Sequence, residues 1–171
     1  GIAFVYLGVR VALVEAAERI LPLYDEALTR PVVDWLRAHD VELHLQARAL
    51  GTSTRGLDIE TARGDRFTIP AEKMLVTIGR KPRTEGWGLE EMAIEMDGPF
   101  VKVDERCATS TRNVWAIGDL TGEPMLAHRA SAQGEMVAEI IAGKKRRFDP
   151  AAIPAICFTE PEIVSVGVDL A

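Results

Sequence analysis

An α/β fold interrupted by a β-meander is predicted by three features of this 171-residue chain. Segments with apolar residues at helical spacing alternate with short apolar segments that are typical of strands. Two alternating segments, 57–61 and 66–69, are joined through a Gly-Asp turn, which indicates a hairpin. The apolar run 73–78 ends at Gly79 and is typical of a strand buried on both faces. This order favours an α/β domain of the nucleotide-binding type.

Both ends of the chain carry incomplete elements. Residues 2–7, with Gly8 behind them, are typical of the last turns of a helix with a glycine at its C′ position. Residues 9–15 then alternate into a short strand. Near the other end, 156–159 and 163–167 are predicted strands that the chain leaves without a partner or cover. We therefore expect this chain to be a piece of a longer protein.

Between the ends, a helix and a strand precede the hairpin. Residues 25–39 place apolar side chains at helical spacing, although Pro31 removes one backbone donor and is expected to kink or shorten that helix. Residues 41–45 alternate apolar and polar side chains, which predicts a half-buried strand. The order is therefore strand, helix, strand, hairpin and buried strand.

The second half is predicted to contain strands at 100–104 and 114–117 and a helix over 127–142 that stops at Gly143. The first half of this helix is rich in alanine, serine and glycine. Small residues let a helix approach another backbone or a flat ligand closely, whereas tight packing of helix on sheet is the alternative. The spacing alone does not separate these two interpretations.

Composition excludes several classes of protein. With 47% hydrophobic and 27% charged residues the chain is unlike disordered sequences, and its net charge of −6 argues against nucleic-acid binding. We interpret the basic run 144–147 as a solvated helix end. Neither a membrane span nor a secretory leader is found, so a soluble cytoplasmic protein is expected. Cys107 and Cys157 lack redox or zinc-site spacing, which predicts buried or half-buried thiols and no metal site.

Glu15 is a candidate nucleotide-binding residue. It ends a strand that follows a helix, where a dinucleotide-binding unit places the acid that binds the adenosine ribose. An acid there accepts the ribose hydroxyls and repels a 2′-phosphate, which favours NAD over NADP. A merely solvated glutamate is the alternative, since the glycine-rich phosphate loop is not in this chain. Arg19 lies near enough in sequence to offset the repulsion.

A second candidate site follows the predicted strand 114–117. Gly118 leaves room for a cofactor chain, and the carboxylate of Asp119 can accept a hydroxyl proton at the end of that strand. The helix start at residues 125–128 offers free N–H groups and a positive dipole end to an electron-rich atom. An Asp119 that only caps the following turn is the alternative.

Six motifs in order resemble the flavin-dependent pyridine nucleotide-disulfide oxidoreductases. The similarity runs over almost the whole chain, and it is the order of several separated motifs that makes it specific. The motifs are Val14-Glu15 with Arg19-Ile20-Leu21-Pro22, Ile78-Gly79-Arg80-Lys81-Pro82, Ala108-Thr109-Ser110, Ala116-Ile117-Gly118-Asp119, Met125-Leu126-Ala127-His128, and Phe158-Thr159-Glu160-Pro161-Glu162 with Val166-Gly167.

The resemblance implies two cofactors, NAD and FAD. Glu15 would bind the adenosine ribose of NAD, Ala49 would hold a backbone position near the adenine, and Gly79 would line the nicotinamide side. Asp119, behind Gly118, would bind the ribityl chain of FAD. The backbone along the pyrimidine end of the flavin would be that of Met125, Leu126, Ala127 and His128.

The resemblance also implies a domain order and a reaction. Residues 1–80 would be most of a Rossmann-like, three-layer NAD-binding domain, 81–150 the second segment of the FAD-binding domain, and 151–171 the start of an α+β dimerisation domain. The members that fit best oxidise a dihydrolipoyl group on the acyltransferase subunit of a 2-oxo acid dehydrogenase complex, passing electrons through a disulfide and FAD to NAD⁺. A homodimer is expected.

The catalytic groups implied by the resemblance lie outside this chain. The redox disulfide and first FAD glycine motif would precede Gly1, and the catalytic His-Glu pair would follow Ala171, so this chain contributes no catalytic residue and is expected to be inactive alone. Cys107 does not match the redox pair. Arg83 stands where most members carry Asn, which leaves that polar contact open.

Three alternatives remain at this point. A related reductase acting on glutathione, mercury or oxygen would share Glu15, Gly79 and Asp119, although the 125–128 motif favours the lipoamide-type enzyme. A nucleotide-binding module without catalysis would bind nucleotide weakly and turn nothing over. A purely structural α/β piece would bind no nucleotide.

Overall fold

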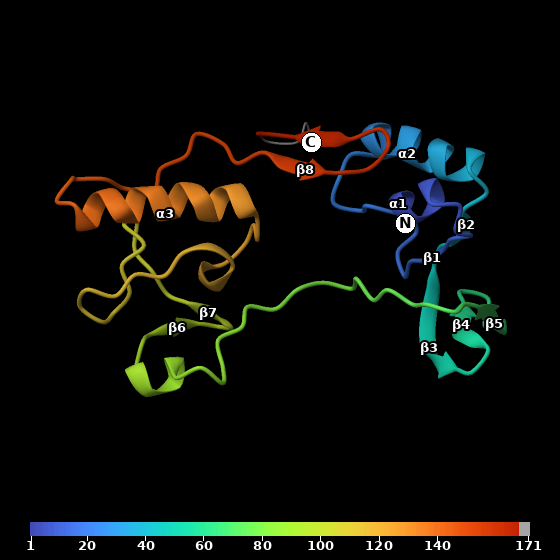
Figure 1. The fold of residues 1–171 in the computed structure, drawn as a ribbon, viewed down its shortest axis with the longest axis horizontal. Helices are drawn as coiled ribbons and strands as arrows, with labels where there is room; N and C mark the ends of the chain where they lie inside the picture. The colour runs from blue at the N-terminus through green and yellow to red at the C-terminus, as the bar shows by residue number, and fades with distance from the viewer. Residues whose placement is uncertain (168–171) are drawn as a thin grey trace. The chain divides into compact units, whose positions relative to one another are not determined.

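A parallel βαβ unit organises the first part of the chain in the computed structural model, which describes residues 1–167. β1 (Ala12–Val14) and β2 (Glu42–His44) pair in parallel, and α2 (Glu26–Ala38) connects them (Figure 1). Parallel strands require such a crossover connection. The short α1 (Ile2–Tyr6) precedes β1 and ends before Gly8, whose φ is +76°. The predicted order of helix end, strand, helix and strand is confirmed.

Helix α2 begins and ends where the sequence indicates. Asp25 is its N-cap, and its Oδ1 accepts a hydrogen bond from the Ala27 N–H at 2.7 Å. Of the two effects expected of Pro31, the shortening is wrong, because α2 runs through it for 13 residues, and the kink stays a prediction. Pro31 and Ala27 are both exposed, so water can bind the carbonyl that the missing N–H leaves unpaired.

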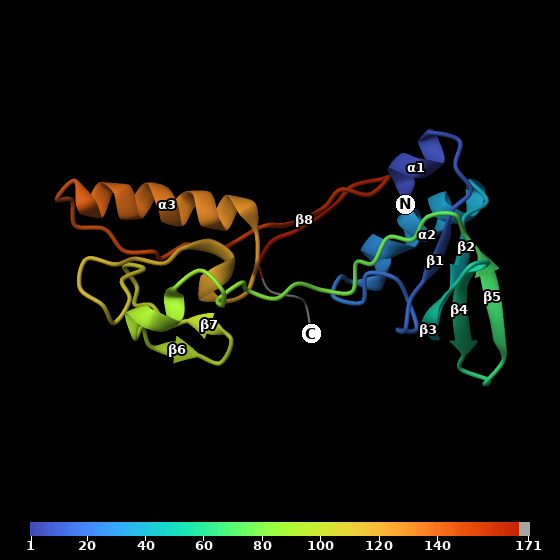
Figure 2. The ribbon, with the colours of Figure 1, turned by 60° about the horizontal axis from the view of Figure 1, so that its bottom comes forward.

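A three-stranded antiparallel meander follows, in the order β3-β4-β5 (Figure 2). β4 (Gly56–Thr61) and β5 (Arg66–Pro70) form the predicted hairpin, and its turn is closed by a hydrogen bond from the Thr61 N–H to the Asp65 carbonyl at 2.9 Å. β3 (Ala47–Ser53) pairs on the other side of β4, with a bulge between Ala49 and Gly51. The residues of β3 do not alternate in a way that predicts a strand.

Two compact units divide the chain. The first unit comprises Gly1–Thr77 with Pro154–Ala171, of which 168–171 lie outside the described residues, and the second unit comprises Ile78–Ile153. The assignment of 1–80, 81–150 and 151–171 to cofactor and dimerisation domains stays a prediction.

The first unit includes a C-terminal hairpin that completes its core. β8 (Ala155–Cys157) and β9 (Ile163–Ser165) pair antiparallel, so the expectation that these strands lack a partner is wrong. Ile163 is 2% exposed and belongs to one buried cluster with residues of α2 and the segment after it. The other buried members of that cluster are Val32, Leu36 and Val41. A hairpin more than a hundred residues further along the chain thus completes this core.

The predicted strand over 73–78 is wrong. This segment is extended without strand pairing, and Leu75, Val76 and Ile78 are 73%, 74% and 94% exposed. A strand buried on both faces needs a neighbour at each edge, because its backbone donors and acceptors must be paired. Within residues 1–167 the one parallel pair is β1-β2, and neither strand hydrogen-bonds to this segment.

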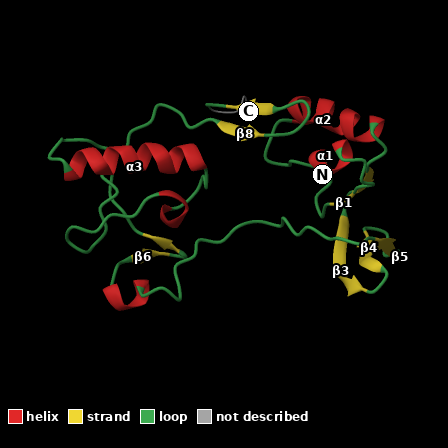
Figure 3. Cartoon of the chain, in the orientation of Figure 1, coloured by secondary structure: helices red, strands yellow, loops and turns green. Residues whose placement is uncertain are grey.

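The second unit is built around one long helix, α3 (Ala127–Ile141) (Figure 3). The hairpin strands β6 (Met96–Asp97) and β7 (Phe100–Val101) and the 3₁₀ turns η1 (Leu89–Met92) and η2 (Gly118–Thr121) make up its other elements. Its core is a cluster in which one face of α3 packs against Cys107, and partly buried aromatic rings surround it. The cluster consists of Cys107, Met136, Val137 and Ile140, with Trp115 and Phe148.

The predicted strand over 114–117 is also wrong, whereas α3 is confirmed. The segment makes an isolated antiparallel bridge, Trp115 opposite Ala108. Hydrogen bonds from Thr109 N–H to Val114 O and from Ala116 N–H to Cys107 O, both 3.0 Å, bind it to a neighbouring loop instead of a parallel sheet. The apolar residues of this segment therefore belong to a local reversal of the chain and not to a central strand.

No helix among residues 1–167 combines the length and apolar character that a membrane crossing requires. The same residues contain no group of three His, Cys, Asp or Glu side chains that could hold a metal ion.

Truncation of Ile59 tests the core of the meander. Ile59 is fully buried in β4 and packs against Ala47 and Ile69, so Ile59→Ala should lower the free energy of unfolding by about 2–5 kcal/mol. Urea unfolding of the chain, followed by circular dichroism, measures the loss. The control is Leu50→Ala, because Leu50 is 46% exposed at the bulge. Equal losses for both variants would contradict this assignment of the core.

Candidate functional site

Glu15 lies where three strands of the first unit meet. Its N–H donates to the His44 carbonyl at 2.9 Å and its carbonyl accepts from the Ala47 N–H at 3.0 Å, so β1, β2 and β3 are joined at this residue. Its Oε1 accepts from the Ala17 N–H at 2.8 Å, and the residue is half-buried. One carboxylate oxygen is thus held by the backbone, which orients the side chain for a further hydrogen-bonding group.

Ala49 lies on β3, two residues after the position that Glu15 binds. It is exposed and faces Ile59 in the strand register, next to the bulge at Leu50. The ladder therefore brings Glu15 and the β3 backbone near Ala49 into one region of the first unit. Neither the periodicity nor the composition of 47–53 indicated this arrangement.

The guanidinium of Arg19 binds backbone carbonyls of the loop that follows it. It donates to the carbonyls of Pro22 and Tyr24, both at 2.8 Å, and more weakly to that of Leu21 at 3.4 Å. These bonds hold the loop that leads to α2. The suggestion that Arg19 offsets the repulsion of a 2′-phosphate stays a prediction.

Gly118 is required by the close approach of η2 to α3. The residue is buried with φ +72°, and a Cβ added to it would lie 3.0 Å from the Ala130 Cβ. Its N–H donates to Oε1 of Gln133 at 2.7 Å, and Gln133 is 2% exposed. The small residues of α3 thus permit helix-to-backbone packing inside the second unit, which is one of the two interpretations the sequence left open.

Asp119 and Met125 are brought together by Arg80, a residue of the Ile78–Pro82 motif to which the sequence gives no role. Nη1 of Arg80 lies 3.7 Å from Oδ2 of Asp119, and its Nη2 donates a short hydrogen bond to the Met125 carbonyl. Asp119 lies in η2 and not at the end of a parallel strand, and its side chain is 48% exposed. The three residues form one polar cluster in the second unit.

The start of α3 has donors that no side chain caps. Leu126 is its N-cap and makes no side-chain hydrogen bond, and its first turn contains no acidic residue. Ala127 and His128 are exposed there, whereas Met125 is 4% exposed. First-turn N–H groups and the positive end of the helix dipole attract a negatively charged or electron-rich atom.

Arg129 holds the turn that precedes α3. Its Nη1 donates to the Gly122 carbonyl at 2.7 Å and to the Pro124 carbonyl at 3.3 Å, and its Nη2 donates to Oγ1 of Thr121 at 3.2 Å. Thr121 Oγ1 in turn donates to the Gly118 carbonyl at 2.9 Å. The backbone between Asp119 and Met125 is therefore fixed from within.

Gly79 lies in the second unit, beside Arg80. It is exposed and has φ +127°, a conformation that a side chain would disfavour. Its predicted place at the nicotinamide side of an NAD site stays a prediction.

The cysteines and the basic run have structural explanations. Cys107 is buried and Cys157 half-buried, as predicted, and burial raises the pKa of the Cys107 thiol. In the basic run, Lys144 and Arg146 both contact Glu139, at 2.8 and 3.3 Å, and the bond to Lys144 lowers the pKa of that carboxyl. Acidic partners thus neutralise much of the run.

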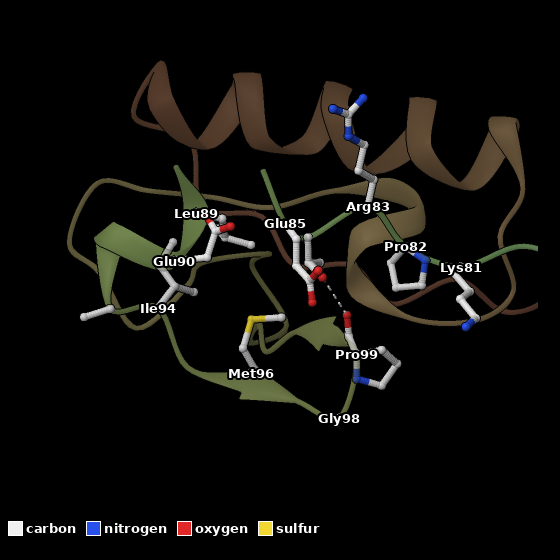
Figure 4. Close-up of a pocket in the computed structure, with 12 residues that line it drawn as sticks. Lys81, Pro82, Arg83, Glu85, Leu89, Glu90, Ile94, Met96, Gly98 and Pro99 are labelled. Atoms are coloured by element: carbon white, nitrogen blue, oxygen red, sulfur yellow. Dashed lines mark hydrogen bonds between the residues drawn. The ribbon is translucent and has the colours of Figure 1, made fainter. Parts of the chain in front are cut away.

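A hollow of about 900 Å³ lies elsewhere in the second unit. Figure 4 shows Glu85, Met96 and Pro99 around it and Lys81 at one end. A hydrogen bond of 3.5 Å from Oγ1 of Thr84 to the Pro99 carbonyl crosses one side of it. None of the predicted site residues lines this hollow, and its charges are mixed, so it does not define the candidate site.

The chain belongs to the pyridine nucleotide-disulphide oxidoreductase family, whose profile matches residues 1–134. Over 168 residues it is 59% identical to the dihydrolipoyl dehydrogenase of Pseudomonas aeruginosa, covering 98% of this chain and 36% of that protein. It is 38% identical over 172 residues to the dihydrolipoyl dehydrogenase of Bacillus subtilis, with 98% and 37% covered. The chain thus spans about a third of the length of these relatives.

Solved structures have the same fold. LpdA from Mycobacterium tuberculosis matches with a TM-score of 0.81 at 30% identity, over 97% of this chain and 37% of that one. The HOCl-induced flavoprotein disulfide reductase RclA from Escherichia coli, as its Cu(II) complex, matches with a TM-score of 0.85 at 24% identity, over 98% and 39%. The predicted α/β class of FAD- and NAD-binding domains is confirmed.

A methyl group at Gly118 tests the approach of η2 to α3. Gly118→Ala should lower the free energy of unfolding by about 1–3 kcal/mol, because the added Cβ meets Ala130 and the positive φ is strained. The matched control is Gly143→Ala, where φ is +90° but no atom lies within 4 Å. Thermal unfolding of both variants separates the clash from the strain. If both lose the same stability, the clash with Ala130 contributes nothing.

Proposed function

We propose that this chain forms the NAD-binding and part of the FAD-binding region of a flavoenzyme that oxidises dihydrolipoyl groups and reduces NAD⁺. The observation that carries the proposal is the 59% identity, over 98% of this chain, to a dihydrolipoyl dehydrogenase. That identity favours the dihydrolipoyl enzyme over reductases of glutathione, mercury or oxygen. The family and its dihydrolipoyl dehydrogenase members use FAD and NAD(H).

The residues around Glu15 fit the adenosine end of NAD. One carboxylate oxygen is held by the Ala17 N–H, which leaves the other oxygen for ribose hydroxyls. The negative charge of the Glu15 carboxylate disfavours a 2′-phosphate. The exposed backbone near Ala49 supports its proposed place beside the adenine, and Gly79 is proposed to line the nicotinamide side.

The residues around η2 and the start of α3 fit FAD. The half-exposed carboxylate of Asp119 accepts a hydrogen bond from a ribityl hydroxyl, and Gly118 holds η2 against α3. The helix start has no side-chain cap at Leu126, which supports a place for the backbone of Met125, Leu126, Ala127 and His128 along the electron-rich pyrimidine end of the flavin. FAD, when bound, supplies the two-electron chemistry that links a dithiol to a nicotinamide.

The remaining proposals concern the whole protein. A dihydrolipoyl group on an acyltransferase subunit is the proposed substrate, and the cytoplasm the proposed location. The hairpin β8-β9 exposes Phe158, Val164 and Val166 by 80%, 55% and 62%, and these apolar side chains support a homodimer contact in the segment that starts at residue 151. The redox disulfide and the catalytic His-Glu pair are proposed to lie in other parts of the protein.

Removal of the Glu15 carboxylate tests the NAD assignment. In the complete protein, Glu15→Ala should lower the ratio of kcat/KM for NAD⁺ over NADP⁺ by about 10- to 100-fold, because it removes both the ribose acceptor and the repulsion of phosphate. Steady-state kinetics with both nucleotides measure the ratio. Glu18→Ala is the matched control, since Glu18 is an exposed acid in the same loop. An unchanged ratio in Glu15→Ala would refute the assignment.

Removal of the Asp119 carboxylate tests the FAD assignment. Asp119→Ala should weaken FAD retention by about 1–3 kcal/mol, because a charged hydrogen bond is lost. The ratio of flavin to polypeptide after extensive dialysis, read from absorbance, gives the retention. Asp97→Ala provides a control at an exposed acid of the same unit. Full flavin occupancy in Asp119→Ala would count against this role.

A further inference from the structure

Arg80 connects two parts of the proposed FAD site from a position far away in sequence. Its guanidinium donates to the Met125 carbonyl, 45 residues along the chain, and lies 3.7 Å from the Asp119 carboxylate. All three residues belong to the second unit. A planar guanidinium presents its donors in a fixed fork, so one side chain can hold both acceptors at a set separation.

The hydrogen bond to Met125 fixes the direction of a peptide group. The bond between Met125 and Leu126 is trans, so its carbonyl and its N–H point in opposite directions. With the carbonyl held by Arg80, the Leu126 N–H is directed away from the guanidinium. The Met125 N–H is also held, because it donates to Oε2 of Glu123 at 3.0 Å. Arg80 therefore sets the orientation of the backbone immediately before α3.

The contact with Asp119 contributes orientation more than stability. The side chains of Arg80 and Asp119 are 63% and 48% exposed, and exposed pairs of this kind stabilise a fold little. The pair still keeps the Asp119 carboxylate beside the guanidinium that binds the Met125 carbonyl. Arg129, by contrast, binds only the turn between η2 and α3, at residues 121–124, and leaves both Asp119 and Met125 to Arg80.

We propose that Arg80 is a positioning residue for FAD: its guanidinium holds the Asp119 carboxylate and the Met125–Leu126 peptide in the arrangement in which the chain binds the ribityl and pyrimidine parts of the cofactor. This inference rests on the proposed function, because it assigns Arg80 to the same site. Arg80 itself acts through Asp119 and the backbone and is not a catalytic residue.

The test uses FAD affinity of the complete protein, stripped of flavin and titrated with FAD while flavin fluorescence is recorded. Arg80→Met should raise the Kd for FAD about tenfold. Arg80→Lys should give a Kd between those of the unchanged protein and Arg80→Met, because an ammonium keeps the charge but lacks the forked donors of a guanidinium. Arg83→Met is the matched control, since Arg83 lies in the same loop and, among the described residues, its guanidinium has no hydrogen bond or ion pair with Asp119 or Met125. Thermal unfolding of each flavin-free variant monitors folding.

A double-mutant cycle distinguishes positioning from general damage. If Arg80 acts through Asp119, the effect of Arg80→Met on the Kd should shrink severalfold in an Asp119→Ala background. The proposal is overturned if Arg80→Met binds FAD like the unchanged protein, if Arg83→Met weakens binding equally, or if the two substitutions are additive. If Arg80→Met fails to fold, the Kd for FAD of Arg80→Lys is compared with that of Arg83→Lys. Equal values would then overturn the proposal. An unchanged protein that binds no FAD would refute the proposed function and this inference together, whereas the preceding outcomes overturn the inference alone.

Discussion

The arrangement of the second unit depends on the close contact between the backbone at Gly118 and helix α3. The buried hydrogen bond from the Gly118 N–H to Gln133, together with the missing Cβ opposite Ala130, fixes η2 against the helix at a distance that a larger residue would not allow. Asp119 follows directly, so the position of its carboxylate is determined by this packing. A buried amide such as Gln133 must be hydrogen-bonded, which makes the contact specific as well as close.

Two arginines complete the candidate regions by binding main-chain carbonyls. Arg19 holds the loop after Glu15, and Arg80 holds the backbone before α3. In both places the guanidinium satisfies carbonyls in loops that have no strand or helix partner of their own. The loops then keep a defined shape next to residues with free acceptor or donor capacity. This is how short irregular segments hold ligand-binding groups in place.

Much of the local structure follows from the sequence, whereas the pairing of apolar segments does not. Asp25, the periodicity of 26–38 and the turn around Gly64 define α2 and the β4-β5 hairpin through local interactions. The runs 73–78 and 114–117 have strand composition, but a strand forms only where a partner offers hydrogen bonds, and that partner is a matter of tertiary structure. For the same reason the Arg80 cluster was missed, since nothing at Arg80 indicates a contact 45 residues away. Glu15, by contrast, could be named as a candidate from the sequence, because the end of the strand and the acid are adjacent in sequence.

The first unit is discontinuous, because its core includes Ile163 from the hairpin β8-β9 as well as residues of α2. During synthesis from the N-terminus, Val32, Leu36 and Val41 are made more than a hundred residues before the side chain that completes their cluster. The second unit, made in between, has all the residues of its own core by Phe148. Synthesis from the N-terminus therefore makes all residues of the second unit's cluster available before Ile163 joins the cluster of the first unit, and until then the apolar side chains of α2 lack that cover.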